Sequence, residues 1–270
     1  MLNYKNPKLV IETSKVEEGS VAWQSPSNIA IIKYWGKHGV QLPRNPSISF
    51  TLENARTQTL LAYRPKTGVD NGLMLDFFFD DEPNEVFGEK IKKFLESILD
   101  IFPFLKQLEL TIKSANSFPN SAGIASSASS MSALALCLCS LEEELFGTLD
   151  DDEEFDKKAS YIARLGSGSA CRSIYPGMAT WGENGALEGS SDLFATPFSE
   201  NVHEVFKTFH DDILIASFDE KSVSSRAGHA LMEDNPFAEI RYNQARQRLH
   251  RLIPGAWLYP DQKYNWILLQ

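Results

Sequence analysis

The sequence predicts a two-domain α+β protein, and three observations support this. Its 270 residues exceed what one average domain needs and are enough for two. The expected elements are a run of strands followed by mixed helices and strands, which is typical of α+β folds. The third observation is the stretch 114–147, in which a loop of Ser, Ala and Gly enters a long apolar segment that ends at Gly147.

The first part of the chain reads mainly as strands separated by turn residues. A turn is expected at 26–28. The segment 28–39 then begins apolar and ends with Lys33 and Lys37, which are four residues apart and would share a face on a helix. Apolar residues at helical spacing predict a helix over 86–102. Alternating patterns and β-forming runs predict strands at 20–25, 46–53, 57–65, 72–82 and 108–114.

The stretch 114–147 organises the rest of the sequence. Residues 127–146 are apolar on every side, which predicts a buried central helix with Gly147 as its C-cap. A small-residue loop before a helix exposes backbone N–H groups at the positive end of the helix dipole, as in phosphate sites. Neither GxxxxGK[ST] nor GxGxxG is present. Two interpretations stay open: an anion-binding loop, or a Ser/Ala-rich loop that enters a buried helix.

After the central helix, the sequence predicts a helix over 151–165 and a second small-residue loop over 166–177. The acidic run at 150–154 is interpreted as the first turn of that helix, where negative charge suits the dipole, in preference to a metal site. A strand is expected at 177–182 and an exposed loop at 183–200, so the domains are predicted as 1–182 and 183–270.

The second predicted domain begins with the loop and continues with a strand at 211–218. Helical segments follow over 222–253 and are expected to break near Asn235 and Pro236. The tail 254–270 departs from the helical pattern and is rich in prolines and aromatic residues. We expect this tail to be atypical of a folded domain end.

Composition excludes several classes of function. The net charge of −10 and the pI near 5.1 argue against a nucleic acid or an anionic membrane as partner. The first 20 residues lack the apolar core of a signal peptide, and no run reaches the length of a membrane span. Cys137 and Cys139 fall within the apolar helix, which points to a reducing compartment. The sequence therefore predicts a soluble, cytoplasmic protein.

Three segments share the chemistry of polyphosphate recognition. They are residues 33–37, with two lysines, residues 121–127, with three serines, and residues 166–172, with Ser, Gly and Arg172. Phosphate oxygens accept several charge-assisted hydrogen bonds, and such segments offer hydroxyls, amides and cations. Each segment alone is weak evidence, because a surface lysine is usually only solvated. Two independent Ser/Gly loops predict two phosphorylated ligands, and Arg226 is a further candidate.

The same segments identify a family. The chain contains Pro26 followed by NIAIIKYWGK (28–37), then NSFPNSAGIASSAS (116–129) and RLGSGSACRSIYPG (164–177). In type and order they resemble the diphosphomevalonate decarboxylases of the GHMP kinase superfamily, over about residues 20–253. The resemblance implies a two-lobed GHMP-kinase-like fold: an N-terminal mixed sheet with helices, and a C-terminal α+β lobe that is expected to be incomplete here.

The resemblance also implies an activity. The family uses ATP and Mg²⁺ to phosphorylate the tertiary hydroxyl of mevalonate diphosphate, after which loss of phosphate and carbon dioxide gives isopentenyl diphosphate. It implies catalytic roles for Lys33, at the reacting centre, and for Arg226, near the substrate carboxylate. The implied substrate-binding residues are Tyr34, Lys37, Ser167, Ser169 and Arg172. The implied ATP-binding residues are Ala122, Gly123, Ala125, Ser126 and Ser127, with a Ser126 or Ser127 hydroxyl, the latter favoured, near Mg²⁺. Members of this family often form homodimers, so a homodimer is a possible partner state.

The chain departs from the family at one point. An Asp-Ala-Gly-Pro-Asn-like segment, whose aspartate contacts the substrate hydroxyl in the family, is absent from these 270 residues. The expectation is a truncated or frame-shifted product that binds its ligands and turns over poorly. The alternatives are a related small-molecule kinase, a non-catalytic nucleotide- or diphosphate-binding homologue, and a fragment that does not fold. Cys171 is interpreted as a packing residue, and the five histidines show no metal-ligand spacing.

Overall fold

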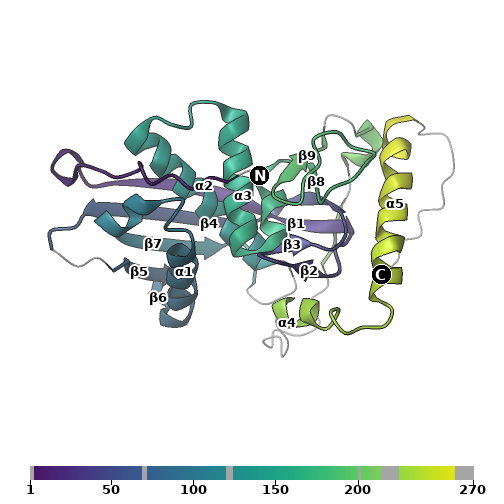
Figure 1. Cartoon of the computed structure of the whole chain (residues 1–270), viewed down its shortest axis with the longest axis horizontal. Helices are drawn as coiled ribbons and strands as arrows, with labels where there is room; N and C mark the ends of the chain where they lie inside the picture. Colours follow the sequence, from purple (N-terminus) through teal and green to yellow (C-terminus); the bar gives the residue numbers. More distant parts are fainter. Residues whose placement is uncertain are drawn as a thin grey trace.

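One mixed sheet with helices on one face forms the framework of the chain (Figure 1). The computed structural model describes residues 3–68, 72–119, 124–199, 202–208, 210–213 and 225–258. The sheet has seven strands in the order β6-β5-β7-β4-β8-β9, with β1 paired to β4. All pairs are antiparallel except β5 with β7. The predicted α+β class is therefore confirmed.

The two longest strands form the spine of the sheet. Strand β1 (Gly19–Ile32) pairs along its length with β4 (Ser47–Pro65), and the register shifts between Pro26 and Ser27. The predicted turn at 26–28 is wrong, because the strand continues through this shift, where a proline is tolerated in an edge strand. The strands predicted at 46–53 and 57–65 are one strand that bends at the same place.

The shared helical face expected for Lys33 and Lys37 is also wrong. Strand β1 ends at Ile32, residues 33–36 form a loop, and Lys37 begins the short strand β2 (Lys37–His38). Strand β2 pairs with β3 (Leu42–Pro43) in a small separate hairpin. The β-branched and apolar run NIAII extends the strand that precedes it, which a helical spacing of two lysines cannot reveal.

The remaining strands complete the sheet. They are β5 (Met74–Phe79), β6 (Glu82–Pro83), β7 (Leu108–Asn116), β8 (Met178–Trp181) and β9 (Ala195–Pro197). The predicted strands 72–82, 108–114 and 177–182 are confirmed within a few residues. Strand β9 lies inside the region predicted as loop, and its three residues are too few for an alternating pattern. The division of the chain near residue 182 stays a prediction.

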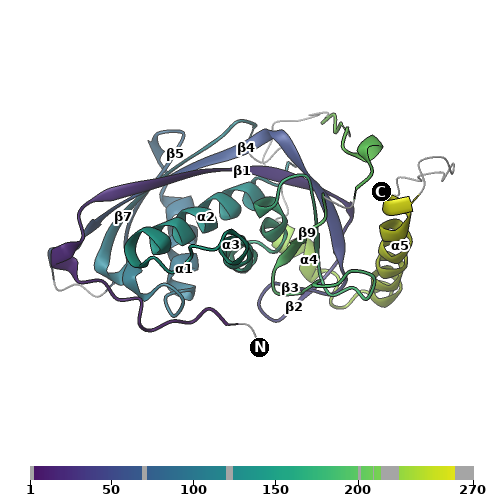
Figure 2. The same cartoon turned by 90° about the horizontal axis from the view of Figure 1, so that it is seen from above.

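Three helices cover one face of the sheet (Figure 2). They are α1 (Glu85–Ser97), α2 (Ser126–Phe146) and α3 (Asp152–Gly166), with short 3₁₀ turns at Thr13–Lys15, Pro103–Gln107, Gly168–Ile174 and Glu204–Phe206. Helix α2 is the predicted central helix, and Gly147 caps it with a φ of 62°. The acidic run lies at the start of α3, where the Asp151 carboxylate accepts a hydrogen bond from the Glu154 N–H at 2.8 Å.

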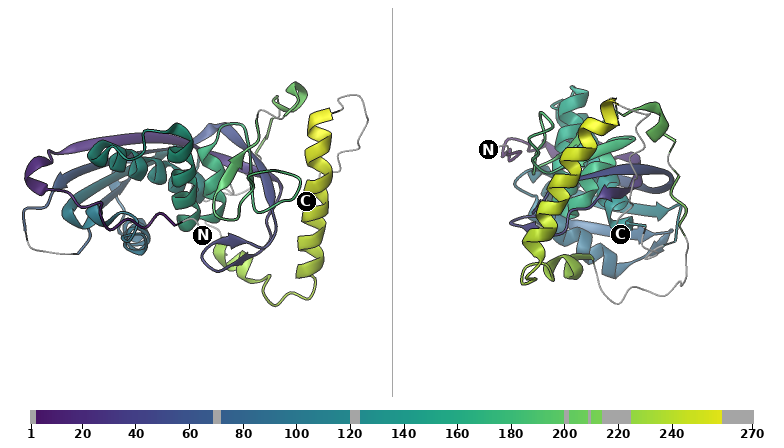
Figure 3. Two further views of the ribbon diagram at one scale, coloured as in Figure 1. Left: turned by 45° about the horizontal axis from the view of Figure 1, so that its top comes forward. Right: turned by 90° about the vertical axis from the view of Figure 1, so that its right-hand side faces the viewer.

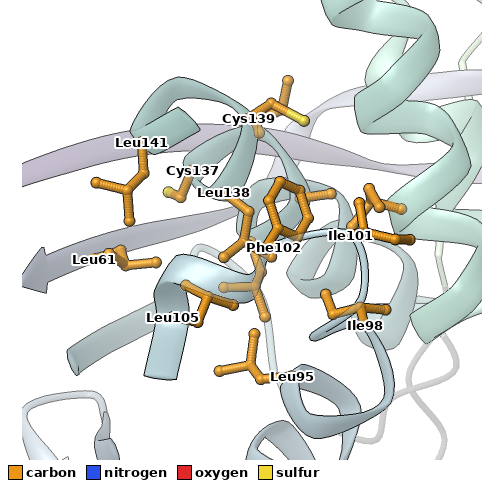
Figure 4. Close-up of a cluster of buried hydrophobic side chains, with 14 of the residues drawn as sticks. Leu61, Leu95, Ile98, Ile101, Phe102, Leu105, Cys137, Leu138, Cys139 and Leu141 are labelled. Atoms are coloured by element: carbon orange, nitrogen blue, oxygen red, sulfur yellow. The ribbon is translucent and has the colours of Figure 1, made fainter. Parts of the chain in front are cut away.

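The main core lies between these helices and the sheet (Figure 4). Leu61 of β4, Phe102 and Leu105 after α1, and Leu138 of α2 are fully buried and meet there. Cys137 and Cys139 lie in the same core as free thiols, as the sequence predicts. None of the helices within the described ranges is long and apolar enough to span a lipid bilayer.

The last two helices stand at the other end of the sheet (Figure 3). They are α4 (Ser225–Ala230) and α5 (Ala238–Leu258), separated near Asn235 and Pro236 as predicted. Helix α5 packs on the end of β1 and β4 in a second core that includes Ile32, Ile48, Ala245 and Leu249. The helix runs to Leu258 and so continues past the predicted change of pattern after residue 253. Most of the strand predicted at 211–218, like the tail after 258, lies outside the described residues.

Candidate functional site

Residues of the three segments with the chemistry of polyphosphate recognition, 33–37, 121–127 and 166–172, lie together at the start of α2. The Ser127 hydroxyl of α2 lies 3.4 Å from the Ser167 hydroxyl, which joins the second segment to the third. Gly168 lies against the Lys37 side chain, so a Cβ at this glycine would be 3.4 Å from Lys37 Cε. The structure therefore brings together segments that are more than 130 residues apart in the sequence.

Arg172 is the centre of this arrangement. The residue is 2% exposed, although it carries a permanent charge. Its guanidinium donates hydrogen bonds to the hydroxyls of Ser49 at 2.8 Å and Ser47 at 2.6 Å and to Asn28 Oδ1 at 3.2 Å. These three acceptors are neutral, and burial lowers the pKa of Arg172. None of the ion pairs within the described ranges includes Arg172.

The ring of Tyr34 lies beside Arg172 and Lys37. The Arg172 guanidinium carbon lies 5.7 Å, and the Lys37 Nζ atom 5.6 Å, from the centre of the Tyr34 ring. The Tyr34 ring also meets Trp181 edge-on at 4.9 Å. Burial raises the pKa of Tyr34, while the charge of Arg172 and the nearby Ser169 side chain oppose this rise. The predicted group Tyr34, Lys37, Ser169 and Arg172 is thus one cluster.

Lys33 lies at the edge of the same cluster. Its Nζ atom donates a hydrogen bond to the Ala30 carbonyl at 3.3 Å. Burial of the amine and, next, the charge of Arg172 lower the pKa of Lys33, while Asp211 raises it. Two cations therefore repel each other here, which favours an anion between or beside them.

The N-terminal end of α2 fits the predicted anion-binding loop. Ala125 precedes the helix with a φ of 53°, and Ser126 and Ser127 begin it with their N–H groups at the positive end of a 21-residue helix. The Ser127 side chain is exposed. Ala122 and Gly123 lie outside the described residues, so their predicted contacts with ATP remain predictions.

Buried hydroxyl groups, which the sequence analysis did not single out, connect the start of α2 to the sheet. The Ser27 hydroxyl donates a hydrogen bond to the Ile124 carbonyl, directly before the helix. Below it, the Ser25 and Ser132 hydroxyls are 2.6 Å apart, and those of Thr57 and Ser129 are also 2.6 Å apart. Short hydrogen bonds between buried hydroxyls fix the position and the rotation of the first turns of α2 relative to the sheet.

Helix α4 contacts the cluster through His229. Arg226 belongs to this helix, and its predicted contact with substrate remains a prediction. His229 lies one turn later and stacks on Tyr34 with ring centres 4.5 Å apart and an angle of 14°. Nothing in the sequence signals His229, Asn28, Ser47, Ser49 or Trp181, because their partners are distant in the chain.

The structure agrees with the packing interpretation of Cys171. Its thiol is fully buried and donates a hydrogen bond to the Gly168 carbonyl at 3.0 Å. Burial raises the pKa of this thiol to about 12. A thiol with such a pKa is a poor nucleophile near neutral pH.

The donor set bears on metal binding as well. Within the described ranges, no group of three or more His, Cys, Asp or Glu side chains could hold a metal ion. Mg²⁺ in nucleotide sites takes many of its oxygen ligands from the phosphates and water. The exposed Ser127 hydroxyl fits a Mg²⁺ ion that arrives with a nucleotide, and not one held by the protein alone.

Comparison with known proteins identifies the family of the chain. A family model described as the diphosphomevalonate decarboxylase-like N-terminal domain matches residues 25–194. The chain is similar to the diphosphomevalonate decarboxylase of Eremothecium gossypii, with 34% identity over 218 residues that cover 76% of this chain and 51% of that protein. The chain thus spans about half the length of the curated relatives it matches.

Solved structures give the same result. The chain is similar to mevalonate diphosphate decarboxylase from Staphylococcus aureus, with a TM-score of 0.68 and 28% identity over 91% of this chain and 69% of that one. It is also similar to a protein named MDDEF, solved in complex with MVAPP, AMPPCP and magnesium. That comparison has a TM-score of 0.64 and 28% identity and covers 88% of this chain and 68% of that one.

Proposed function

Because the chain belongs to the diphosphomevalonate decarboxylase-like family, we propose that it binds ATP and mevalonate diphosphate for ATP-dependent decarboxylation to isopentenyl diphosphate. The other products are ADP, phosphate and carbon dioxide. The family match contains all three segments that meet at the start of α2. The complex of the related MDDEF with MVAPP, AMPPCP and magnesium supports the same classes of ligand here.

The observation that carries this proposal is the buried charge of Arg172. A buried ion is stable only when hydrogen bonds and an opposite charge compensate for its lost hydration. Arg172 has three neutral acceptors, and neither Arg172 nor Lys33 forms an ion pair with an acid in the described ranges. An anionic ligand beside these cations supplies the missing negative charge. Mevalonate diphosphate carries a diphosphate and a carboxylate and meets this need.

We assign the two ligands to two sides of the site. The nucleotide phosphates take the start of α2, where Ala125, Ser126 and Ser127 offer amides and hydroxyls. Ala122 and Gly123, outside the described residues, belong to this assignment as family expectations. Mg²⁺, when bound with ATP, neutralises phosphate charge, and Ser127 offers it one oxygen. The substrate diphosphate takes the other side, with Tyr34, Lys37, Ser167, Ser169 and Arg172.

The chemistry requires mainly positioning and charge. Transfer of the terminal phosphoryl group of ATP to the tertiary hydroxyl spreads negative charge over the phosphate oxygens, which nearby cations stabilise. We propose Lys33 for this role and Arg226 for orienting the substrate carboxylate. The tertiary phosphate then leaves with the C–O electron pair. The electrons of the bond to the carboxylate form the new carbon–carbon double bond as carbon dioxide departs.

The proposal also includes a cellular compartment, a class of ligand and an assembly state. The free thiols of Cys137, Cys139 and Cys171 are buried and unpaired with one another, which supports a reducing compartment such as the cytoplasm. The acidic net charge of −10 supports small anions at a local basic cluster, and not nucleic acid, as ligands. A homodimer and the division into lobes near residue 182 belong to the proposal as family expectations.

Calorimetric titration tests the ligand assignment. The chain is titrated with mevalonate diphosphate, with mevalonate, and with AMPPCP plus Mg²⁺. We expect mevalonate diphosphate to bind at least about a hundredfold more tightly than mevalonate, because only the former brings a diphosphate to the cations. Equal affinities for the two compounds, or no binding of either, would contradict the proposal. Arg64→Gln is a suitable control variant, because Arg64 is exposed and pairs with Glu109 away from the site.

A further inference from the structure

His229 joins helix α4 to the predicted substrate side of the site through two contacts. Its Nδ1 atom lies 3.0 Å from the Trp35 carbonyl, and its ring stacks on Tyr34 at 4.5 Å. A carbonyl oxygen only accepts hydrogen bonds, so Nδ1 carries the proton. His229 therefore contacts two consecutive residues of the segment 33–37 although it lies 194 positions from Trp35.

The stacked ring restricts the movement of Tyr34. One face of the Tyr34 ring lies against His229, and Trp181 meets the ring edge-on at 4.9 Å. The Tyr34 ring is thus held on one face by His229 and by the edge-on contact with Trp181. Aromatic contacts of this kind contribute free energy beyond buried area and depend on geometry. The direction of the Tyr34 hydroxyl thus depends on a residue of α4.

Helix α5 holds the same segment from another side. The Arg241 guanidinium lies 4.2 Å from the centre of a Trp35 ring, and Tyr242 packs against Gly36 so closely that a Cβ at Gly36 would lie 2.3 Å from its hydroxyl. Arg246 donates a hydrogen bond to the Arg44 carbonyl at 2.5 Å. Helix α5 therefore contacts Trp35 and Gly36 of this segment independently of α4.

We propose that His229 is a positioning residue, which orients Tyr34 toward the diphosphate group and fixes α4 against residues 34–35. This inference rests on the proposed function and names a residue beyond those that the segments predict. His229 acts through Tyr34 and Trp35 and does not itself contact the substrate.

Three substitutions separate the two contacts. His229→Phe keeps a flat ring on Tyr34 and removes the hydrogen bond to Trp35. His229→Asn places an amide N–H near the position of Nδ1 and removes the stacked ring. His229→Ala removes both contacts. His250→Ala is the matched control, because His250 is an exposed histidine of α5.

The first readout is the dissociation constant for mevalonate diphosphate, measured by calorimetry beside that for AMPPCP with Mg²⁺. We expect His229→Ala to weaken mevalonate diphosphate binding by about tenfold and the Phe and Asn variants by less, since each keeps one contact. AMPPCP binding and cooperative thermal unfolding should be retained in His229→Ala, and the His250→Ala variant should stay close to the unchanged chain in both ligand affinities. Equal mevalonate diphosphate affinity in His229→Ala and the unchanged chain would overturn the inference.

The second readout needs no ligand and separates this inference from the proposed function. Hydrogen exchange is followed in the free chain for residues 33–37 and 225–232. We expect His229→Ala to speed exchange in both segments, while exchange in α2 stays unchanged. If the unchanged chain binds no mevalonate diphosphate, the proposed function fails, and exchange alone decides the role of His229. Unchanged exchange in both segments would then contradict the link between α4 and Tyr34.

Discussion

Arg172 donates a hydrogen bond to Asn28 Oδ1 at 3.2 Å. This contact joins the segment 166–172 to strand β1, which leads into the segment 33–37. Asn28 in turn donates to the Ser173 hydroxyl at 2.7 Å and to the Ser169 carbonyl at 3.1 Å. The guanidinium and the amide are thus oriented by each other. This pair gives the site proposed for the substrate a preformed, buried positive charge.

Replacement of Arg172 tests the role of this buried charge. Arg172→Lys keeps the charge, but an ammonium cannot reach Ser47, Ser49 and Asn28 in the fork geometry of a guanidinium. We expect mevalonate diphosphate binding to weaken by about 10- to 100-fold in Arg172→Lys and more in Arg172→Gln. Calorimetry measures the effect, with Arg64→Lys as the control. Unchanged affinity in Arg172→Gln would exclude Arg172 from the site.

Ser127 tests the nucleotide side. Its exposed hydroxyl stands in the first turn of α2, next to Ser167. We expect Ser127→Ala to weaken binding of AMPPCP with Mg²⁺ by about fivefold, since one neutral oxygen ligand is lost. Mevalonate diphosphate binding and the melting temperature should change little. Ser97→Ala, in α1, is the control, and an equal effect of both variants would count against the assignment.

The contact between α2 and α3 contains a buried ion pair. The Lys158 Nζ atom lies 2.7 Å and 2.5 Å from the two carboxylate oxygens of Glu142, and both residues are almost fully buried. We expect Lys158→Met to lower the free energy of unfolding by about 3–5 kcal/mol, because Glu142 would keep an uncompensated buried charge. The double variant Lys158→Met, Glu142→Leu should lose less. Urea unfolding of Lys158→Met, of Glu142→Leu and of the double variant measures these losses. A double variant that loses as much stability as the two single variants together would contradict this account.

The lowered pKa of His229 predicts that the stability of the chain depends on pH. Burial lowers its pKa, and the nearby charge of Lys37 adds to this effect, whereas the hydrogen bond to Trp35 opposes it. Tyr34 and Lys37 are the titratable groups around the imidazole. As the pH falls below about 6.5, the unfolded chain takes up the proton before the folded chain does, so the free energy of unfolding decreases.

The substitution His229→Phe isolates this contribution. Urea unfolding at pH 7.5 and pH 5.5 should show a smaller loss of stability in His229→Phe than in the unchanged chain. The other histidines are common to both proteins and cancel in the difference. An equal loss in both proteins would mean that His229 binds its proton equally well in the folded and unfolded chains.

Local patterns predicted much of this fold. The apolar run before Gly147 gave α2, and the acidic turn after it gave the start of α3, because each depends on neighbours in the sequence. The path of β1 through Pro26 was not predictable, since its partner residues 52–56 decide whether a proline turns the chain or sits in a register shift. Strand β9 is defined only by its pairing with β8.

In the candidate site, too, sequence analysis predicted only those residues whose neighbours in the chain indicate their role. Tyr34, Lys37, Ser169 and Arg172 were predicted from their segments, because Ser, Gly and basic residues in short loops indicate phosphate chemistry directly. Ser47 and Ser49 look like ordinary strand residues, and only the fold turns them toward Arg172. His229 has no local pattern at all. Its role follows from the stacking on Tyr34, which lies in another part of the chain.

A single-turnover assay tests the central claim most directly. The chain is mixed with MgATP and carboxyl-labelled mevalonate diphosphate, and ADP and labelled carbon dioxide are followed separately. The proposed decarboxylation predicts both products in equal amounts, with Arg172→Gln forming neither at a comparable rate. ADP without carbon dioxide would instead indicate a kinase. Neither product, with both ligands bound, would indicate a non-catalytic binding protein and contradict the decarboxylase function of this chain.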